Sequence, residues 1–166
     1  MLTELLKEPS ADWKYLAEIR INDDIPSLNK LLGMRTRWGK PIPISSLTKQ
    51  WSRKIAGAQI EQLGPQWLDK ILVTTPHPVR KLVLVRSCRR KMDTDNCYGG
   101  AKVIIDSLKS KIIYVNENVR TRTGGWFYDD NPKYLDLVVK QRKEGEPGMK
   151  PFVTFYLWEK VNEPTS

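Results

Sequence analysis

The strongest constraint on the fold is the continuous apolar run Leu82–Val85, inside a longer apolar segment from Val79 to Cys88. A strand with one face in water alternates apolar and polar residues, but this run has no polar interruption. It therefore predicts a central strand that is covered on both faces.

Three other segments have strand character. Tyr15–Asn22 alternates apolar and polar residues, as a half-buried strand does. Tyr134–Arg142 and Phe152–Trp158 are rich in β-forming residues, and turn formers at Gly145–Gly148 separate them. The last two segments predict a hairpin with an extended loop.

Two segments have helical spacing. Ser45 or Ser46 can cap a helix that runs to Leu63, where Gly64–Pro65 ends it. Ala101–Leu108 repeats apolar residues at the spacing i, i+3, i+4 and i+7.

The start of the second helix bears on function. Asp95 or Asn96 is placed to cap it, and the pair Gly99–Gly100 is expected to weaken or delay its first turn. Lys102 and Asp106 share another face of this helix, where Asp106 either orients Lys102 or forms a simple surface ion pair.

Asn22–Pro43 holds turn formers and prolines together with basic residues and Trp38, which predicts a long basic loop. Two interpretations stay open here. The loop lies on DNA, or it is a solvated connection with Trp38 packed beneath it.

These segments predict an α/β (α+β) fold, a small mixed sheet with helices packed on it, in the rough order β-α-β-α-β-β. A length of 166 residues favours one domain over residues 1–166. The ends, 1–12 and 160–166, are expected to fray.

The charge points to a polyanionic partner. Lys and Arg number 28 against 19 Asp and Glu, which gives a net charge of +9. Nucleic acid fits this excess through phosphate neutralisation. A membrane is not expected, because no stretch approaches the roughly 20 apolar residues that a spanning helix requires.

The chain is predicted to be cytoplasmic, because its N-terminal residues lack the pattern of a secretory signal. Cys88 and Cys97 are accordingly expected to be reduced thiols. A zinc site that combines them with His77 is disfavoured, since neither CxxC nor HxxxH spacing is present.

The most informative polar feature is Asp93–Asn96, with the sequence DTDN. It follows the basic run Arg89–Lys91 and is matched downstream by Asp129–Asp130. Carboxylates one residue apart in a turn can share Mg²⁺, which prefers oxygen ligands and keeps waters and substrate phosphate oxygens. Such acidic ligands in basic surroundings favour a metal-dependent nuclease over their alternative use as helix caps and turns.

Together these segments resemble the RusA family of Holliday junction resolvases, found in bacteria and their phages. The resemblance is carried by Asp93–Asn96 after a strand and a basic stretch, by Lys102 before Asp106–Leu108, and by Gly125–Asp130 followed by Asn131–Tyr134. A looser likeness extends from Tyr15 to Trp158.

The resemblance implies that Asp93, Asp95 and Asp130 are the catalytic, metal-binding carboxylates, with Asp129 as a possible ligand, and that Lys102 is the catalytic lysine. It also implies Mg²⁺- or Mn²⁺-dependent cutting of four-way DNA junctions by a homodimer, during recombination and repair in a bacterial or phage-infected cell. Dimerisation is expected physically as well, because paired nicks on symmetry-related strands suit a twofold dimer.

The sequence departs from the family pattern in two places. Cys97–Gly100 lengthens the spacing before Lys102, and Lys109–Gly124 is a long insertion. The insertion is predicted to form an extra hairpin. An alternative alignment would place Asn116 or Glu117 at the position of the second acidic ligand, but Pro132–Lys133 favours Asp130.

The side chains predicted to contact DNA are basic: Arg35, Arg37, Arg86, Arg89, Arg90, Lys91, Arg120 and Arg122. Two other functions remain open. One is a non-catalytic DNA-binding accessory protein of recombination on the same scaffold, and the other is a nuclease for flaps or forks.

Overall fold

The computed structural model describes residues 12–67, 77–109, 111–116, 119–123 and 125–161. Its elements are β1 (Trp13–Ile21), α2 (Leu28–Gly33), α3 (Ile44–Leu63), β2 (Arg80–Cys88), α5 (Thr94–Leu108), β3 (Lys111–Asn116), β4 (Val119–Thr123), β5 (Leu135–Lys143) and β6 (Phe152–Lys160). This mixed α+β architecture confirms the predicted fold class.

The main sheet has four strands in the order β1-β6-β2-β5. Strand β2 runs parallel to β5 and antiparallel to β6. Leu82 and Leu84 enter the larger core, while Val83 and Val85 pack on the opposite face with Tyr156. The prediction of a central strand with both faces covered is confirmed.

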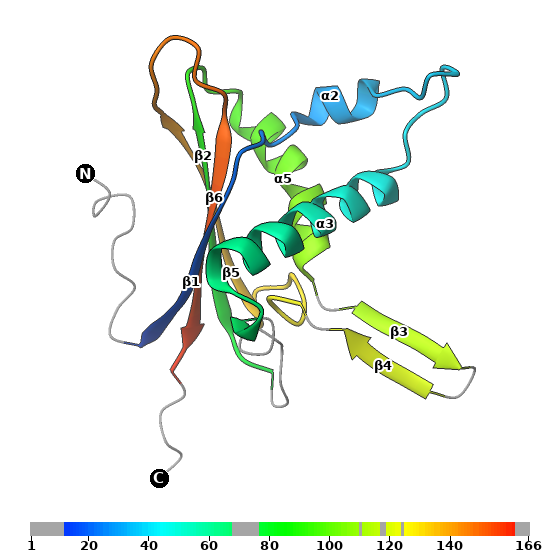
Figure 1. The fold of residues 1–166 in the computed structure, drawn as a ribbon, viewed down its shortest axis with the longest axis vertical. Helices are drawn as coiled ribbons and strands as arrows, with labels where there is room; N and C mark the ends of the chain where they lie inside the picture. The colour runs from blue at the N-terminus through cyan, green and yellow to red at the C-terminus, as the bar shows by residue number, and fades with distance from the viewer. Residues whose placement is uncertain (1–11, 68–76, 110, 117–118, 124, 162–166) are drawn as a thin grey trace.

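The helices lie on one side of this sheet, and the β3–β4 hairpin projects away from it (Figure 1). Helix α3 packs against β1 and α5, and α2 packs against α5. The core between helices and sheet is made by apolar side chains such as Trp51, Ile55 and Ile104. No helix in the described ranges is long and apolar enough to span a membrane.

The predicted hairpin of the last two strands is wrong. Strand β2 lies between β5 and β6, so these two strands do not pair. The reason is that β2 is apolar on both faces and can bury both only as a central strand of the sheet. It therefore lies between β5 and β6. The loop 144–151 passes the C-terminal end of β2, where Cys88 pairs with Lys143 and Ser87 with Phe152.

The segment 22–43 is not a simple loop, because it contains helix α2. Ser27 caps this helix, and its hydroxyl oxygen accepts a hydrogen bond from the Lys30 backbone N–H at 3.1 Å. Trp38 is 78% exposed, so the interpretation in which it packs beneath the segment is wrong.

Helix α3 begins at Ile44, one residue before the predicted caps. Pro43 occupies the N-cap position and makes no side-chain cap hydrogen bond. Ser45 and Ser46 therefore lie inside the first turn. Gly64 follows the helix with a positive φ of 82°, as expected for the glycine that ends it.

Helix α5 begins at Thr94, so the glycine pair does not delay it and neither Asp95 nor Asn96 is its cap. Gly100 instead permits a close approach of the helix to the chain after β1. A Cβ at Gly100 would lie 1.5 Å from the Pro26 carbonyl oxygen. The glycine is thus required by packing, which the sequence pattern alone does not reveal.

The inserted segment forms the predicted extra hairpin, with Arg120 opposite Tyr114 and Arg122 opposite Ile112 in the β3–β4 register. The predicted DNA contacts of these two arginine side chains lie outside what the structure describes. Residues 1–11 and 162–166 also lie outside it. Lys160, expected in a frayed end, belongs to β6, and its N–H donates to the Val79 carbonyl at 2.9 Å.

Candidate functional site

The acidic segment Gly125–Asp130 is attached to the end of α5. The Trp126 N–H donates to the Leu108 carbonyl at 2.8 Å, and Phe127 forms a parallel bridge with Lys109. Trp126 and Phe127 are buried at 4% and 0% exposure, so they anchor the segment in the core. Asp129 and Asp130 follow after Tyr128 and remain only half-buried.

Two buried polar residues fix this segment further, and sequence reasoning missed both. Arg80 is 2% exposed, and its guanidinium donates to the Trp126 carbonyl at 2.8 Å and to the Glu159 carboxylate at 2.9 Å. The Trp126 indole N–H donates to Gln59 Oε1 at 3.3 Å. The only available signal was weak and concerned Arg80, a charged residue just before the apolar run Leu82–Val85.

Lys102 and Lys109 join the acidic segment to α5 in what we term the Lys–Asp cluster, which contains Lys102, Asp106, Lys109, Asp129 and Asp130. Lys102 Nζ forms an ion pair with Asp130 and lies 2.9 Å from Asp106. Lys109 Nζ forms an ion pair with Asp129 and lies 3.1 Å from Asp130. Asp106 therefore pairs with Lys102 one turn away, as the i, i+4 spacing predicted.

The cluster fixes the charge of Asp130 and Lys102. The hydrogen bond from Lys102 is the largest effect and holds the pKa of Asp130 well below its ordinary value; burial opposes it, and the hydrogen bond from Lys109 lowers the pKa further. Burial lowers the pKa of Lys102, but the hydrogen bonds to Asp130 and Asp106 outweigh it and raise that pKa. At neutral pH Asp130 is therefore an anion and Lys102 a cation, so Lys102 can stabilise charge but cannot accept a proton.

Asp93 and Asp95 lie at the other end of the same helix, and both are exposed. Asp93 occupies the N-cap position without a side-chain cap hydrogen bond. Within the described residues, neither carboxylate makes a hydrogen bond or ion pair with another side chain. Their negative charge suits the positive end of the helix dipole.

The two parts of the predicted site are separated by about half the length of the helix. Asp95 and Lys102 are seven residues apart, which corresponds to about 10 Å at a rise of 1.5 Å per residue. A delayed helix would have left Asp93 and Asp95 in a loop, whereas the helix from Thr94 holds Asp95 in its first turn and Asp93 at its N-cap.

No group of three His, Cys, Asp or Glu side chains that could hold a metal ion occurs among the residues described. Asp93, Asp95 and Asp130 are thus not gathered into such a group, and the metal site stays a prediction. The carboxylate oxygens of these residues are hard donors of the kind that Mg²⁺ prefers. Those of Asp93 and Asp95 are not bound by another side chain among the described residues.

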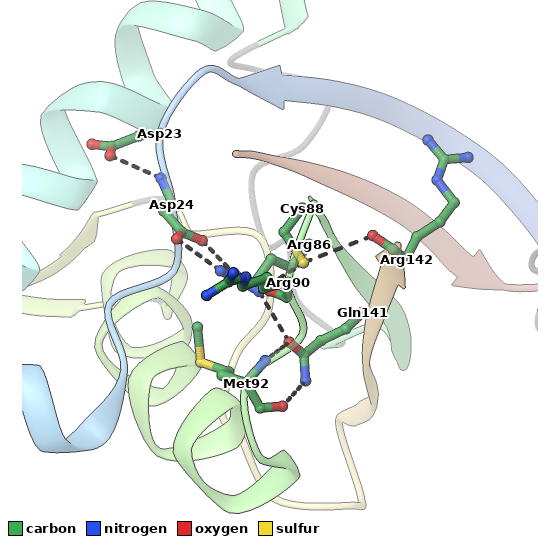
Figure 2. A network of polar contacts seen from close by, with 8 residues as sticks. All are labelled: Asp23, Asp24, Arg86, Cys88, Arg90, Met92, Gln141 and Arg142. Carbon is green, nitrogen blue, oxygen red and sulfur yellow. Dashed lines mark hydrogen bonds and ion pairs between the residues drawn. The ribbon is translucent and has the colours of Figure 1, made fainter. Parts of the chain in front are cut away.

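The predicted DNA-contacting arginines differ in placement. Arg86 is 5% exposed and forms a two-pronged ion pair with Asp24, so its guanidinium is engaged inside the protein, and its contact with DNA stays a prediction. Its other nitrogen donates to Cys88 Sγ at 2.7 Å, to the Arg90 carbonyl at 3.1 Å and to Gln141 Oε1 at 3.1 Å (Figure 2). A buried strand end leaves no room for a solvated guanidinium, so the side chain is paired internally.

The other predicted basic contacts are accessible. Arg89, Arg90 and Lys91 are exposed in the turn between β2 and α5. Arg37 is exposed and lies 4.9 Å from the centre of the Trp38 ring. Arg35 is exposed too, although its guanidinium also donates to the backbone carbonyls of the α2 end.

Both cysteines are buried and unpaired, in agreement with the prediction of free thiols. Burial raises the pKa of each thiol, and the nearby Arg86 opposes that effect. Neither thiol is therefore activated as a nucleophile.

Comparisons with protein-family models, with curated proteins and with solved structures found no match to this chain. The resemblance to the RusA family thus rests on the residues themselves.

Proposed function

We propose that this protein is a metal-dependent endonuclease that cuts branched DNA, with the four-way junction as its principal substrate. The observation that carries the proposal is the ion pair between Lys102 and Asp130, which are 28 residues apart in sequence. These are two of the four residues that the resemblance to the RusA family implies for catalysis. Contact between them supports the assignment of both to one site.

In the proposed reaction Lys102 supplies a permanent positive charge beside the scissile phosphate. Its raised pKa keeps it protonated, so it stabilises the charge that develops on the phosphoryl oxygens or the leaving oxygen. Asp130 and Asp106 position its ammonium group. Asp130 stays ionised because its pKa is lowered, which leaves it competent as a ligand for a cation.

Asp93 and Asp95, with Asp130, would hold Mg²⁺ or Mn²⁺. Magnesium sites on phosphate substrates commonly use one or two protein carboxylates and complete their coordination with water and phosphate oxygens. The ion would supply an activated water and charge neutralisation for phosphodiester hydrolysis. A twofold homodimer is part of the proposal, because two equivalent sites are needed to nick two strands of one junction.

A second candidate is a DNA-binding accessory protein without catalysis. It is favoured by the arrangement of Asp129 and Asp130, whose carboxylates are already engaged by Lys102 and Lys109. In that case the carboxylates and lysines hold the acidic segment on α5 and serve no chemical step.

The test is incubation of the purified protein with end-labelled DNAs at several Mg²⁺ concentrations and in EDTA. The substrates are a four-way junction, a flap, a fork and a linear duplex of the same sequence. We expect paired nicks in the junction that depend on Mg²⁺, with slower cutting of the linear duplex. Junction binding without nicks at any Mg²⁺ concentration would instead identify the accessory protein, and preferred cutting of flaps or forks would change the substrate.

A further inference from the structure

A basic pocket lies at the C-terminal end of the parallel strands β2 and β5, away from the Lys–Asp cluster. It has a volume of about 840 Å³, and its lining residues are Arg86, Cys88, Arg89, Arg90, Lys143, Glu144, Gly145, Met149 and Pro151. One wall is the turn after β2 and the other is the loop 144–151. Ligands of sheets with parallel strands commonly bind beyond the carboxyl ends of those strands.

A part-buried polar network between the ends of β2 and β5 holds the basic turn of the pocket in place. Arg86 donates to the Arg90 carbonyl at 3.1 Å. The side-chain amide of Gln141, in β5, makes two hydrogen bonds with the backbone of Met92 (Figure 2). Its nitrogen donates to the Met92 carbonyl at 2.8 Å, and its oxygen accepts from the Met92 N–H at 3.0 Å. The backbone from Arg90 to Met92 is therefore fixed before any ligand arrives.

The opposite wall is attached to the same strand end. The Glu144 N–H donates to the Cys88 carbonyl at 3.0 Å. The two walls are thus linked across the end of β2, and the sheet sets the distance between their backbones. A site built in this way loses little conformational entropy when it binds.

Of the four cations that line the pocket, Arg86 is engaged inside the protein, and the other three are not paired with any described residue. Arg86 is neutralised by Asp24, and Glu144 by Arg142. Arg89, Arg90 and Lys143 form no ion pair among the residues that the structure describes. Three positive charges therefore remain in a pocket whose acidic members are already paired, and such a pocket suits a polyanion.

From this arrangement we infer that the pocket binds the phosphate backbone of the nucleic acid, with Arg89 and Arg90 on one wall and Lys143 on the other as the contacting residues. The identity of the polyanion rests on the proposed function. The same turn continues through Lys91 to Asp93, so a strand held in the pocket leads to the N-terminus of α5. Lys143 and the loop 144–151 are thereby assigned a role in binding.

The test is equilibrium binding of a fluorescently labelled four-way junction in EDTA, measured by anisotropy over a range of salt concentrations. The double variant Arg89→Gln, Lys143→Gln removes one cation from each wall and spares the buried network. The matched control is Lys14→Gln, Lys160→Gln, which removes the same charge from exposed residues at the opposite end of the sheet, where β1 begins and β6 ends.

Each lost phosphate contact should flatten the plot of log affinity against log salt by about 0.9. The pocket variant should therefore lose about 1.8 in slope, with roughly a tenfold weaker affinity per contact at 0.1 M salt. The control should keep the wild-type slope. Equal slopes and affinities for pocket variant and control would overturn the inference.

The single variants Arg89→Gln and Lys143→Gln are measured in the same way and should each lose about half of the effect. Circular dichroism checks that every variant is folded. Because the assay contains no metal, its outcome is separate from that of the cleavage test. If the wild type binds through the pocket but never cuts, only the proposed nuclease activity is refuted. If the wild type cuts and the pocket variant binds as tightly as the wild type, only the inference about the pocket is refuted.

Discussion

Substitution of Gly100 by alanine tests whether the glycine pair in α5 serves packing. The added methyl carbon would lie 1.5 Å from the Pro26 carbonyl oxygen and 2.8 Å from its carbon. A separation below 3.0 Å is essentially never seen for a real Cβ, so the helix and the Pro26 backbone must move apart by about 1.5 Å. Overpacking against rigid backbone costs about 3 kcal/mol or more, and alanine returns about 1 kcal/mol of helix propensity.

We therefore expect Gly100→Ala to lower the free energy of unfolding by about 2 kcal/mol. Two other helical glycines are matched controls. Gly57 in α3 has nothing within 4 Å of the position that an added methyl carbon would occupy, so Gly57→Ala should stabilise by about 0.5–1 kcal/mol. The three atoms nearest to a methyl carbon added at Gly99 belong to the Leu28 side chain, at 2.9–3.1 Å, and a side chain yields more easily than backbone, so Gly99→Ala should cost much less than Gly100→Ala.

The assay is equilibrium unfolding in urea followed by circular dichroism, with all four proteins compared at one temperature. The order of stability should be Gly57→Ala, then wild type and Gly99→Ala, then Gly100→Ala. If Gly100→Ala is as stable as Gly57→Ala, the close approach of α5 to Pro26 is wrong, and the placement of Lys102 on that helix loses its basis.

Three further outcomes are expected. Asp24→Ala leaves the buried charge of Arg86 unpaired and should lower the free energy of unfolding by about 2–3 kcal/mol, less than for a fully buried pair because Asp24 is 36% exposed. The control Asp136→Ala breaks the exposed ion pair with Lys81 and should cost less than about 1 kcal/mol in the same urea assay. Equal costs for the two variants would contradict this prediction. Because the folded pKa of Asp130 lies below its ordinary value of 3.8, its ion pairs stabilise the fold above that pH and are lost as the pH falls below it. The difference in unfolding free energy between wild type and Asp130→Asn should thus be constant near neutral pH and shrink below about pH 4, and a difference that persists unchanged to lower pH would refute the pairing. Lys102→Ala should slow junction cutting about 10²- to 10³-fold and weaken junction affinity far less, because it removes a contact to the transition state; equal losses in rate and affinity would contradict that role.

Much of the fold could be predicted from patterns that are local in sequence. The run Leu82–Val85 identified the central strand because burial on both faces requires uninterrupted apolar residues. The stripe in Ala101–Leu108 identified most of α5. The inserted hairpin was also predicted, since its two β-rich segments are close in sequence.

Features that depend on distant partners could not be predicted in this way. Adjacent β-rich segments usually pair, but β2 separates β5 from β6 because of its own demand for burial. Gly100 was expected to weaken a helix, and only its contact with Pro26 explains why it lies inside one. Arg86 was expected on the surface, and only the distant Asp24 and Gln141 show why it is buried.

The candidate site was predicted in part. The contact between Lys102 and Asp130 agrees with their assignment to one site. Lys109, which engages both Asp129 and Asp130, was missed because a lysine directly after a helix has no distinctive sequence pattern. The early start of α5 determines the separation between Asp95 and Lys102, and helix boundaries are among the features that sequence patterns locate least well.

The most direct test of the proposed function is the initial rate of four-way junction cutting in Mg²⁺ by wild type, Asp93→Asn and Asp130→Asn. Asp136→Asn is the matched control, since it removes an ion-paired aspartate from an exposed position on β5. We predict that wild type and the control nick the junction in two opposed strands, while the other two variants bind it and leave it intact. Cutting by Asp93→Asn and Asp130→Asn at the wild-type rate would contradict the account.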